Sequence, residues 1–428
     1  MDGLGKYCLT HCPTVVVGIL TKLLQVRISR KRILESAAKV MELYARHKVV
    51  LELEYQGEVG TGLGPTLEFY TLLSHELQRS NLGMWRDSPH PPKSSADAAP
   101  DAGAAVGFVH APQGLFPAPM DAKQAGSEAG GKVLSHFRLL GRSVAKALQD
   151  ARLMDLPLSR ALWRRALGVQ LTLHDVADID PALGSTLQRL AGAVDGVVDG
   201  VPIEDLCLSF EVPGHAGYDL GKRSAAVTAS NVHAFIDAVV DATVGRGVDA
   251  QVNAFVEAFN EVFDISALHA FSPEELDMLL CGTSEAWNIE TLTDVIKFDH
   301  GYTTQSQPAQ HLLTTLAEFD HAEQRRFLRF VTGSPRLPPG GLAALQPRLT
   351  VVRKHSSGGE RQSGASGPSL GPSVGSLGPI AQRIADTDLP SVMTCANYIK
   401  LPPYSSKDVL RSRILFAINE GQGSFDLS

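Results

Sequence analysis

The sequence feature that most constrains this chain lies near its carboxyl end, in residues 389–404, Leu-Pro-Ser-Val-Met-Thr-Cys-Ala-Asn-Tyr-Ile-Lys-Leu-Pro-Pro-Tyr. Two proline boundaries enclose Cys395, and residues 397–401 after it are typical of a short strand. A final helix is predicted from Ser405 to Glu420, ended by Gly421. A lone cysteine in such a loop is compatible with a buried structural thiol or with a nucleophile, because spacing does not show thiolate character.

The order of residues around Cys395 separates these two interpretations. Residues 389–404 resemble the active-site loop of the HECT-type E3 ubiquitin-protein ligases, in which Leu-Pro, Thr-Cys, Asn and Leu-Pro-x-Tyr follow one another. Residues 327–338 and 137–168 also resemble that family. The Gly-Thr-Gly-Leu-Gly-Pro-Thr run within residues 57–70 is similar to the branch that degrades ubiquitin-fusion substrates, which includes plant and algal members.

This resemblance implies an α+β, bilobal fold. We expect a large, mostly helical N-lobe (residues 1–281), a flexible hinge at residues 282–284, and a smaller α/β C-lobe (residues 285–428) that carries the cysteine. Residues 88–131 and 355–378 are rich in Ala, Pro, Gly and Ser without periodicity, so we predict that they are disordered inserts.

Local patterns predict several individual elements. Residues 27–46 have apolar positions at helical spacing behind a capping Ser29, and residues 48–56 alternate as a half-buried strand. Two helix starts are marked by capping boxes: Ser272 with Glu275, and Asp320 with Glu323. Glycines 282 and 333 end these two helices.

The glycine-rich stretch at residues 57–65 follows a predicted strand and precedes a predicted helix at residues 66–78. Such an arrangement occurs in phosphate-binding loops, but no Gly-Lys-Ser/Thr closes this one, and its glycine spacing differs from that of a dinucleotide fingerprint. We therefore interpret it as a tight turn that needs positive φ angles.

Length, charge and cysteine content limit the class of protein. A chain of 428 residues can form two or three domains, and its net charge of −7 argues against a general binder of nucleic acid or membranes. Five scattered cysteines favour a reducing compartment, cytoplasmic or nuclear. We find no secretory signal, no bilayer-spanning stretch, no zinc-site spacing and no motif for a cofactor.

The expected chemistry uses Cys395 as the nucleophile. A thiolate that attacks another protein's thioester exchanges like for like, so the step is close to thermoneutral and needs no strong acid or base. Much of the family has a histidine two residues before the cysteine, but this chain has Met393. Thr394 is a candidate to stabilise the thiolate or the oxyanion, and its alternative role is only to satisfy hydrogen bonds within its own loop. Asn397 is expected to brace that loop.

Three further site residues are predicted. The resemblance places the subdomain that docks the ubiquitin-conjugating enzyme (E2) at about residues 195–262, where Phe255 is a candidate exposed docking aromatic, or simply a core residue. Phe425 resembles the family's terminal aromatic, which helps to hold the donor ubiquitin or the lobe arrangement during transfer, and otherwise it belongs to a disordered chain end. Asp426 is a candidate to deprotonate or orient the incoming lysine, and otherwise is a solvated terminal acid.

The leading hypothesis is an E3 ubiquitin-protein ligase that accepts ubiquitin from an E2 as a thioester on Cys395 and passes it to substrate lysines, towards proteasomal degradation. Its partners would be the E2, ubiquitin and protein substrates, with no cofactor and no metal. The alternatives are a thiol hydrolase, for which the sequence fixes no histidine near Cys395, and a non-catalytic interaction module. The substrates, the linkage type, the particular E2 and the presence of upstream substrate-recruiting repeats stay open.

Overall fold

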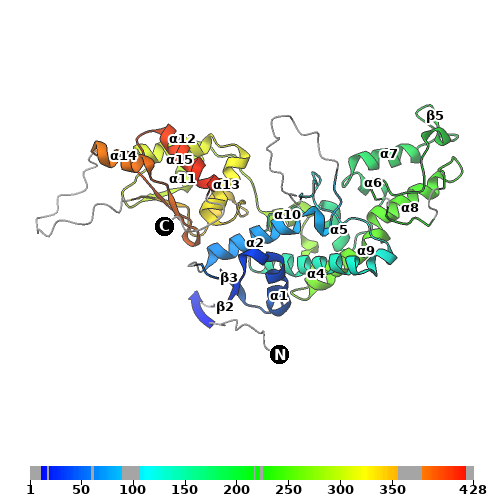
Figure 1. Ribbon diagram of the computed structural model, residues 1–428, viewed down its shortest axis with the longest axis horizontal. Helices are drawn as coiled ribbons and strands as arrows, with labels where there is room; N and C mark the ends of the chain where they lie inside the picture. Colours follow the sequence, from blue (N-terminus) through cyan, green and yellow to red (C-terminus); the bar gives the residue numbers. More distant parts are fainter. Residues whose placement is uncertain are drawn as a thin grey trace, which may run out of the picture.

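A computed structural model describes residues 11–16, 19–58, 62–88, 107–215, 217–221, 225–354 and 378–420 (Figure 1). Its buried apolar side chains form two separate cores. The first runs from Leu24 to Cys281 and the second from Trp287 to Ile418. The first core is mostly helical and the second surrounds a mixed sheet, so the predicted α+β class is confirmed.

The N-lobe begins with a three-stranded sheet of β1 (His11–Val16), β2 (Ile19–Ile28) and β3 (Val50–Tyr55). β1 is antiparallel to β2, and β2 is parallel to β3. Leu51, Leu53 and Tyr55 are buried on one face of β3, which confirms the predicted alternation. The helix predicted from residue 27 starts later, as α1 (Ile33–Tyr44), because residues up to Ile28 belong to β2.

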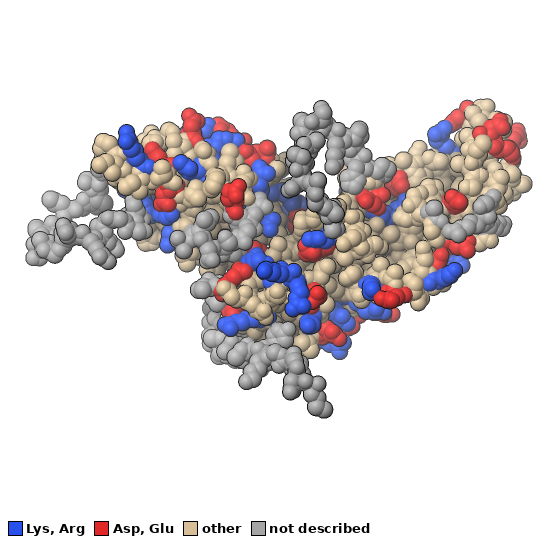
Figure 2. Space-filling view, in the orientation of Figure 1, with Lys and Arg blue, Asp and Glu red and all other residues tan. Residues whose placement is uncertain are grey.

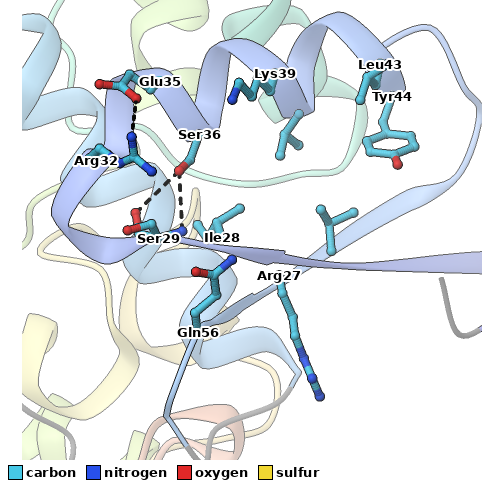
Figure 3. Close-up of a pocket in the computed structure, with 12 residues that line it drawn as sticks. Arg27, Ile28, Ser29, Arg32, Glu35, Ser36, Lys39, Leu43, Tyr44 and Gln56 are labelled. Atoms are coloured by element: carbon cyan, nitrogen blue, oxygen red, sulfur yellow. Dashed lines mark hydrogen bonds and ion pairs between the residues drawn. The ribbon is translucent and has the colours of Figure 1, made fainter. Parts of the chain in front are cut away.

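Ser29 does not cap that helix as predicted. The short 3-10 turn η1 (Arg30–Arg32) follows it, and Ser29 makes no side-chain cap to this turn. Instead its backbone is fastened to α1, because Ser36 Oγ accepts from the Ser29 N–H at 3.3 Å and donates to the Ser29 carbonyl at 3.4 Å (Figure 3). The same place holds a small cavity of about 70 Å³ between β2 and α1.

Helices make up most of the remaining body of the N-lobe. They are α2 (Leu63–Leu77), η2 (Ser80–Leu82), α3 (Ala122–Ala125), α4 (Glu128–Gln149), α5 (Arg160–Ala166), η4 (Arg246–Val248), α9 (Asp249–Asn260), η5 (Ile265–Ala270) and α10 (Pro273–Cys281). The long α4 packs against α9, and their approach is close because Gly141 has no side chain: a Cβ there would lie 2.2 Å from the Phe255 carbonyl oxygen.

The prediction of disorder across residues 88–131 is wrong for its second half. Residues 107–131 are ordered and include α3 and the start of α4. Asp121 forms a capping box with Gln124, and Ser127 caps α4, so polar residues that suggested a loop are helix caps. Residues 89–106 of this predicted insert, and residues 355–377 of the other, lie outside the described residues.

A smaller group of elements projects from one end of the N-lobe (Figure 1). It contains α6 (Leu173–Val176), α7 (Pro181–Ala191), the hairpin of β4 (Val197–Val198) and β5 (Val201–Pro202), η3 (Ile203–Leu206) and α8 (Val232–Val244). Its extent differs from the predicted 195–262, because α6 and α7 lie before that range and α9 packs along α4 in the body of the lobe.

The connection between the lobes follows α10. Ser272 and Glu275 form the predicted capping box, and Gly282 follows the helix with a φ of 74°. Thr283 then pairs with Leu337, and a Cβ on Gly282 would lie 2.1 Å from the Leu337 carbonyl oxygen. The position of the hinge at residues 282–284 stays a prediction.

The C-lobe sheet has the order β6-β7-β9-β8, built from β6 (Lys297–Asp299), β7 (Thr350–Arg353), β9 (Tyr398–Leu401) and β8 (Ser391–Met393). β6, β7 and β9 are parallel, whereas β8 is antiparallel to β9. The helices are α11 (Ile289–Val295), α12 (Gln307–Ala317), α13 (His321–Thr332), η6 (Gly341–Ala344), α14 (Pro379–Thr387) and α15 (Lys407–Glu420).

α13 has the predicted Asp320 and Glu323 capping box and ends at Gly333, so both signals are confirmed. In the described ranges, none of the helices would cross a bilayer as an apolar span.

Candidate active site

Cys395 lies in a short 3-10 turn, η7 (Thr394–Ala396), which joins β8 to β9 at the edge of the C-lobe sheet. The two strands pair up to Met393 and Tyr398, so the turn is the loop of a tight antiparallel pair. Asn397 closes it in the left-handed region, with a φ of 48°, a conformation that asparagine tolerates better than most residues.

Asn397 also ties this turn to the rest of the C-lobe. The residue is 4% exposed, and its Nδ2 donates to the Pro347 carbonyl at 2.7 Å. Its own carbonyl accepts from the Thr350 N–H at 2.9 Å. The predicted bracing role of Asn397 is therefore confirmed, and Cys395 sits on a fixed backbone.

The cysteines of the described residues differ in their surroundings. Cys395 and Cys207 are exposed, whereas Cys281 is buried and burial raises the pKa of its thiol far above the ordinary range. Met393, at the position where much of the family has a histidine, is 48% exposed. Within the described ranges no hydrogen bond joins a histidine to Cys395, so nothing there supports the arrangement that a thiol hydrolase requires.

Thr394 is placed differently from Cys395. Thr394 as a whole is 8% exposed, and its side chain faces the first turn of α2 in the N-lobe. A Cβ on Gly64 would lie 2.1 Å from Thr394 Oγ1 and 3.2 Å from the Cys395 backbone nitrogen, and a Cβ on Gly62 would lie 4.0 Å from the Cys395 Cβ. The start of α2 is therefore packed directly against the turn that carries the thiol.

The glycine-rich stretch thus has two roles, of which sequence reasoning found one. Gly57 and Gly62 have φ angles of 82° and 88°, which confirms the predicted tight turn at the described glycines. Gly64 has no such backbone requirement, and its absent side chain allows the lobes to approach. A glycine inside a first helical turn costs stability relative to alanine, and this cost was the signal that could have revealed the contact.

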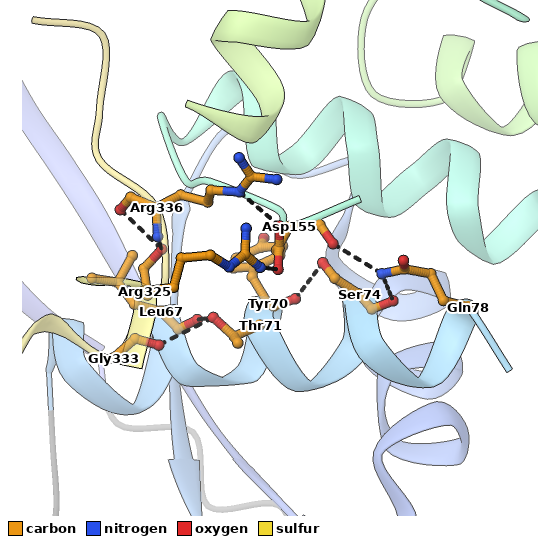
Figure 4. Close-up of polar contacts among 10 residues, drawn as sticks. Leu67, Tyr70, Thr71, Ser74, Gln78, Asp155, Arg325, Gly333 and Arg336 are labelled. Carbon is orange, nitrogen blue, oxygen red and sulfur yellow. Dashed lines mark hydrogen bonds and ion pairs between the residues drawn. The ribbon is translucent and has the colours of Figure 1, made fainter. Parts of the chain in front are cut away.

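The seam between the lobes continues along α2. Thr71 Oγ1 donates to the Gly333 carbonyl at 3.1 Å, and a Cβ on Gly333 would lie 3.0 Å from the Gly64 carbonyl oxygen. Asp155, in the loop after α4, accepts from Arg336 Nε at 2.8 Å and from Arg325 (Figure 4). Burial alone would raise the pKa of Asp155, but these two guanidinium groups outweigh it and hold the pKa below its ordinary value.

The N-lobe side of this seam is held by Arg30. Its guanidinium makes a bidentate pair with Glu68 of α2, at 2.6 and 2.9 Å, and a second pair with Glu58 at 2.7 Å. It also lies 3.9 Å from the centre of the Tyr55 ring. Thr66 Oγ1 donates to the Gly62 carbonyl at 3.2 Å, so the turn before α2 is fixed from both sides.

The remaining predicted site residues are not brought to Cys395 by the described structure. Phe255 is 1% exposed and packs between α9 and α4, so the prediction of an exposed docking aromatic is wrong, and its alternative as a core residue holds. Phe425 and Asp426 lie outside the described residues. Among the described side chains, no cluster of three His, Cys, Asp or Glu residues could hold a metal ion.

Comparison with known proteins shows which family this chain belongs to. The family described as "HECT-domain (ubiquitin-transferase)" matches residues 71–428. The chain belongs to the HECT family. It is 51% identical to the E3 ubiquitin-protein ligase UPL3 of Arabidopsis thaliana, over 94% of this chain and 22% of that protein.

Two other relatives, one from a plant and one from yeast, are also similar over nearly the whole chain. The chain is 46% identical to the E3 ubiquitin-protein ligase UPL4 of Arabidopsis thaliana, over 93% of this chain and 26% of that protein. It is 35% identical to ubiquitin fusion degradation protein 4 of Saccharomyces cerevisiae, over 94% of this chain and 26% of that protein. This HECT chain therefore spans about a quarter of the length of these relatives.

Proposed function

We propose that this chain is the catalytic domain of an E3 ubiquitin-protein ligase, with Cys395 as the residue that carries ubiquitin. The observation that supports this most directly is an exposed thiol on a braced turn, beside the start of α2, in a chain of the HECT family. The partners are ubiquitin, a charged E2 and protein substrates. A cytoplasmic or nuclear location is part of the proposal, because exposed thiols suit a reducing compartment.

The proposed reaction has two steps. In loading, the Cys395 sulfur attacks the thioester carbonyl of the charged E2, a new C–S bond forms, the E2 C–S bond breaks, and the proton of the Cys395 thiol ends on the E2 thiol. In discharge, a neutral lysine amine attacks the Cys395 thioester. A C–N bond forms, the C–S bond breaks, and the amine's proton ends on the Cys395 sulfur.

We place the E2 on the β4–β5 hairpin instead of on Phe255. Val194, Val197 and Val201 are 71%, 38% and 40% exposed, and they gather at this tip. Figure 2 shows acidic side chains around the same end of the molecule, and exposed Asp195 and Glu204 belong to it. An apolar centre with a charged rim is typical of a protein interface. A Val194→Asp variant should lose loading, whereas Leu43→Asp, at a 56% exposed position on α1, should retain it.

The two proposed steps need different lobe arrangements. The hairpin lies at the opposite end of the molecule from α13 and α15 of the C-lobe (Figure 1), while the Cys395 turn rests on α2. The C-lobe must therefore swing towards the hairpin for loading, which supports a hinge at residues 282–284.

One assay tests the proposed function. The protein is incubated with activating enzyme, E2, ATP and ubiquitin, and the products are resolved with and without a thiol reductant. We expect a reductant-labile ubiquitin adduct that is absent in Cys395→Ala. The matched control is Cys207→Ala, which removes an exposed thiol of the projecting subdomain and should leave the adduct in place. An adduct that persists in Cys395→Ala would refute the proposal.

A further inference from the structure

The start of α2 is enclosed by two loops of the C-lobe. On one side a Cβ on Gly64 would lie 2.1 Å from Thr394 Oγ1 and 3.0 Å from Thr394 Cβ. On the other side the Gly64 carbonyl oxygen would lie 3.0 Å from a Cβ on Gly333. Real non-bonded carbon and oxygen atoms do not approach to 2.1 Å, so the lobes can meet in this way only while residue 64 has no side chain.

The turn before α2 and the cysteine turn are each fastened within their own lobe, so neither can yield locally at this contact. On the N-lobe side, Arg30 holds Glu68 and Glu58 on both flanks of the turn, and Thr66 holds the Gly62 carbonyl. On the C-lobe side, Asn397 ties the cysteine turn to Pro347. A methyl group at position 64 would therefore displace the C-lobe from the seam instead of being absorbed locally.

We propose that Gly64 is a positioning residue for discharge: its missing side chain seats the Thr394–Cys395 turn against the N-lobe, and this seated arrangement is the one that passes ubiquitin to a lysine. The proposal rests on the proposed function of Cys395. Loading takes place with the C-lobe swung towards the β4–β5 hairpin, where the seam is open and residue 64 makes no contact with Thr394.

Seating promotes discharge by fixing geometry. The contact involves the Cys395 backbone nitrogen, at 3.2 Å from the position of a Gly64 Cβ, while the side chain stays exposed. A thioester on that side chain is then held at a constant place over the N-lobe surface, where an amine can attack its carbonyl carbon as the C–S bond breaks and the sulfur takes up the amine's proton. Such alignment lowers the barrier without a change in the reacting groups.

The test separates the two steps with the full chain. Loading is measured as the rate of thioester formation from charged E2, and discharge as the loss of that thioester to free lysine after E2 charging is stopped. For Gly64→Ala we expect loading within about twofold of the wild type and discharge slower by about tenfold or more, as expected from a misplaced reacting group. The thioester should therefore accumulate.

Two further variants keep the test specific. Gly131→Ala is the matched control, because Gly131 also lies in the first turn of a helix, without positive φ, and nothing lies within 4 Å of its Cβ position. Thr394→Ala removes the oxygen at 2.1 Å, so the penalty of Gly64→Ala should fall to about threefold or less when measured in that background, as a coupled pair requires.

Another variant, at Thr71, covers the case in which Gly64→Ala does not fold. Thr71→Val removes the hydrogen bond to the Gly333 carbonyl with little change of shape, and discharge should slow by about threefold or more while loading is retained.

The outcomes are distinguishable. Wild-type protein that forms no Cys395-dependent adduct would defeat the proposed function, and this inference with it. Normal loading with unchanged discharge in Gly64→Ala would overturn the inference alone. Equal losses of loading and discharge, together with a lowered melting temperature in both Gly64→Ala and Thr71→Val, would show a merely structural role and would overturn it as well.

Discussion

Asp155 offers the sharpest test of how the two lobes are held together. It belongs to the N-lobe, and its two partners, Arg325 and Arg336, belong to the C-lobe side of the connection. Its side chain is 20% exposed, and those of Arg325 and Arg336 are 41% and 24% exposed. The pairs are therefore partly screened by water, and their contribution lies between that of surface and buried ion pairs.

The expected magnitude follows from these contacts. Charge-assisted hydrogen bonds contribute about 1.5–3 kcal/mol each when well shielded, and we reduce the sum to about 2 kcal/mol for Asp155→Asn because of the partial exposure. At about 1.4 kcal/mol per factor of ten, the equilibrium between seated and open lobes would shift by about 30-fold towards the open arrangement.

The assay is energy transfer between fluorophores placed on α1 and α15, with discharge measured in parallel. Asp155→Asn should lower the transfer efficiency and slow discharge. The control is Asp199→Asn, which removes a pair with Arg189 whose two side chains are both 60% exposed, within the projecting subdomain. If energy transfer and discharge in Asp155→Asn match those of the wild type, the ion pairs of Asp155 do not hold the lobes together.

The same carboxyl fixes a pH dependence. Its pKa is lower in the folded protein than in the unfolded chain, so its contribution is present above the unfolded value and is lost as the pH falls through the folded value. Lobe seating should therefore be constant between about pH 6 and 8 and weaken only below about pH 4, where carboxyl groups take up protons. Energy transfer that fell between pH 8 and 6 would contradict this.

Three further predictions follow from single contacts. Arg30→Ala leaves Glu68, 6% exposed, without its partner, and should lower the free energy of unfolding by about 2–3 kcal/mol in denaturant titration; a loss under about 0.5 kcal/mol would contradict it. Asn397→Ala removes the hydrogen bond to Pro347 and replaces an asparagine that has a left-handed backbone. The rates of both loading and discharge should therefore fall by about tenfold or more in single-turnover assays. A normal loading rate would argue against the bracing role. Ser284→Pro should slow loading while leaving the melting temperature close to that of the wild type. A loading rate equal to that of the wild type would place the hinge elsewhere.

The choice of residue 284 follows from the structure. Proline at Gly282 is unsuitable because that residue has a φ of 74°, which proline cannot adopt, and any side chain there would meet the Leu337 carbonyl. Ser284 is exposed, and Thr283 before it is already in an extended bridge, as a residue preceding proline must be.

Short-range chemistry was the part of the fold that the sequence predicted well. The capping boxes at Ser272 and Asp320, the stop at Gly333 and the alternation of β3 each depend on residues within a few positions of one another, and all are present. The bracing role of Asn397 was predicted from its place two residues after the cysteine, although the carbonyl that its side chain binds belongs to Pro347, 50 residues away along the chain.

The error on Phe255 and the missed contact of Gly64 concern distant segments, whereas the error on residues 88–131 is local. Phe255 looked like a docking aromatic, but it is covered because Gly141 of α4 lets α9 approach closely, 114 residues away along the chain. Likewise the glycine in the first turn of α2 signals a close contact, but nothing in the sequence points to Thr394, 330 residues away, as the residue that packs on Gly64. The ordered half of residues 88–131 was missed because its caps, Asp121 and Ser127, have the composition of a loop. Only the folded arrangement shows which distant segments meet.

The central claim is that the sulfur of Cys395 carries ubiquitin, and its most direct test is the intact mass of the protein after charging. Wild-type chain should gain the mass of one ubiquitin and lose it on treatment with a thiol. Cys395→Ser should form an oxygen ester of the same mass that the thiol does not remove. A thiol-labile adduct that forms equally well in Cys395→Ser would place the acceptor elsewhere and would contradict this account.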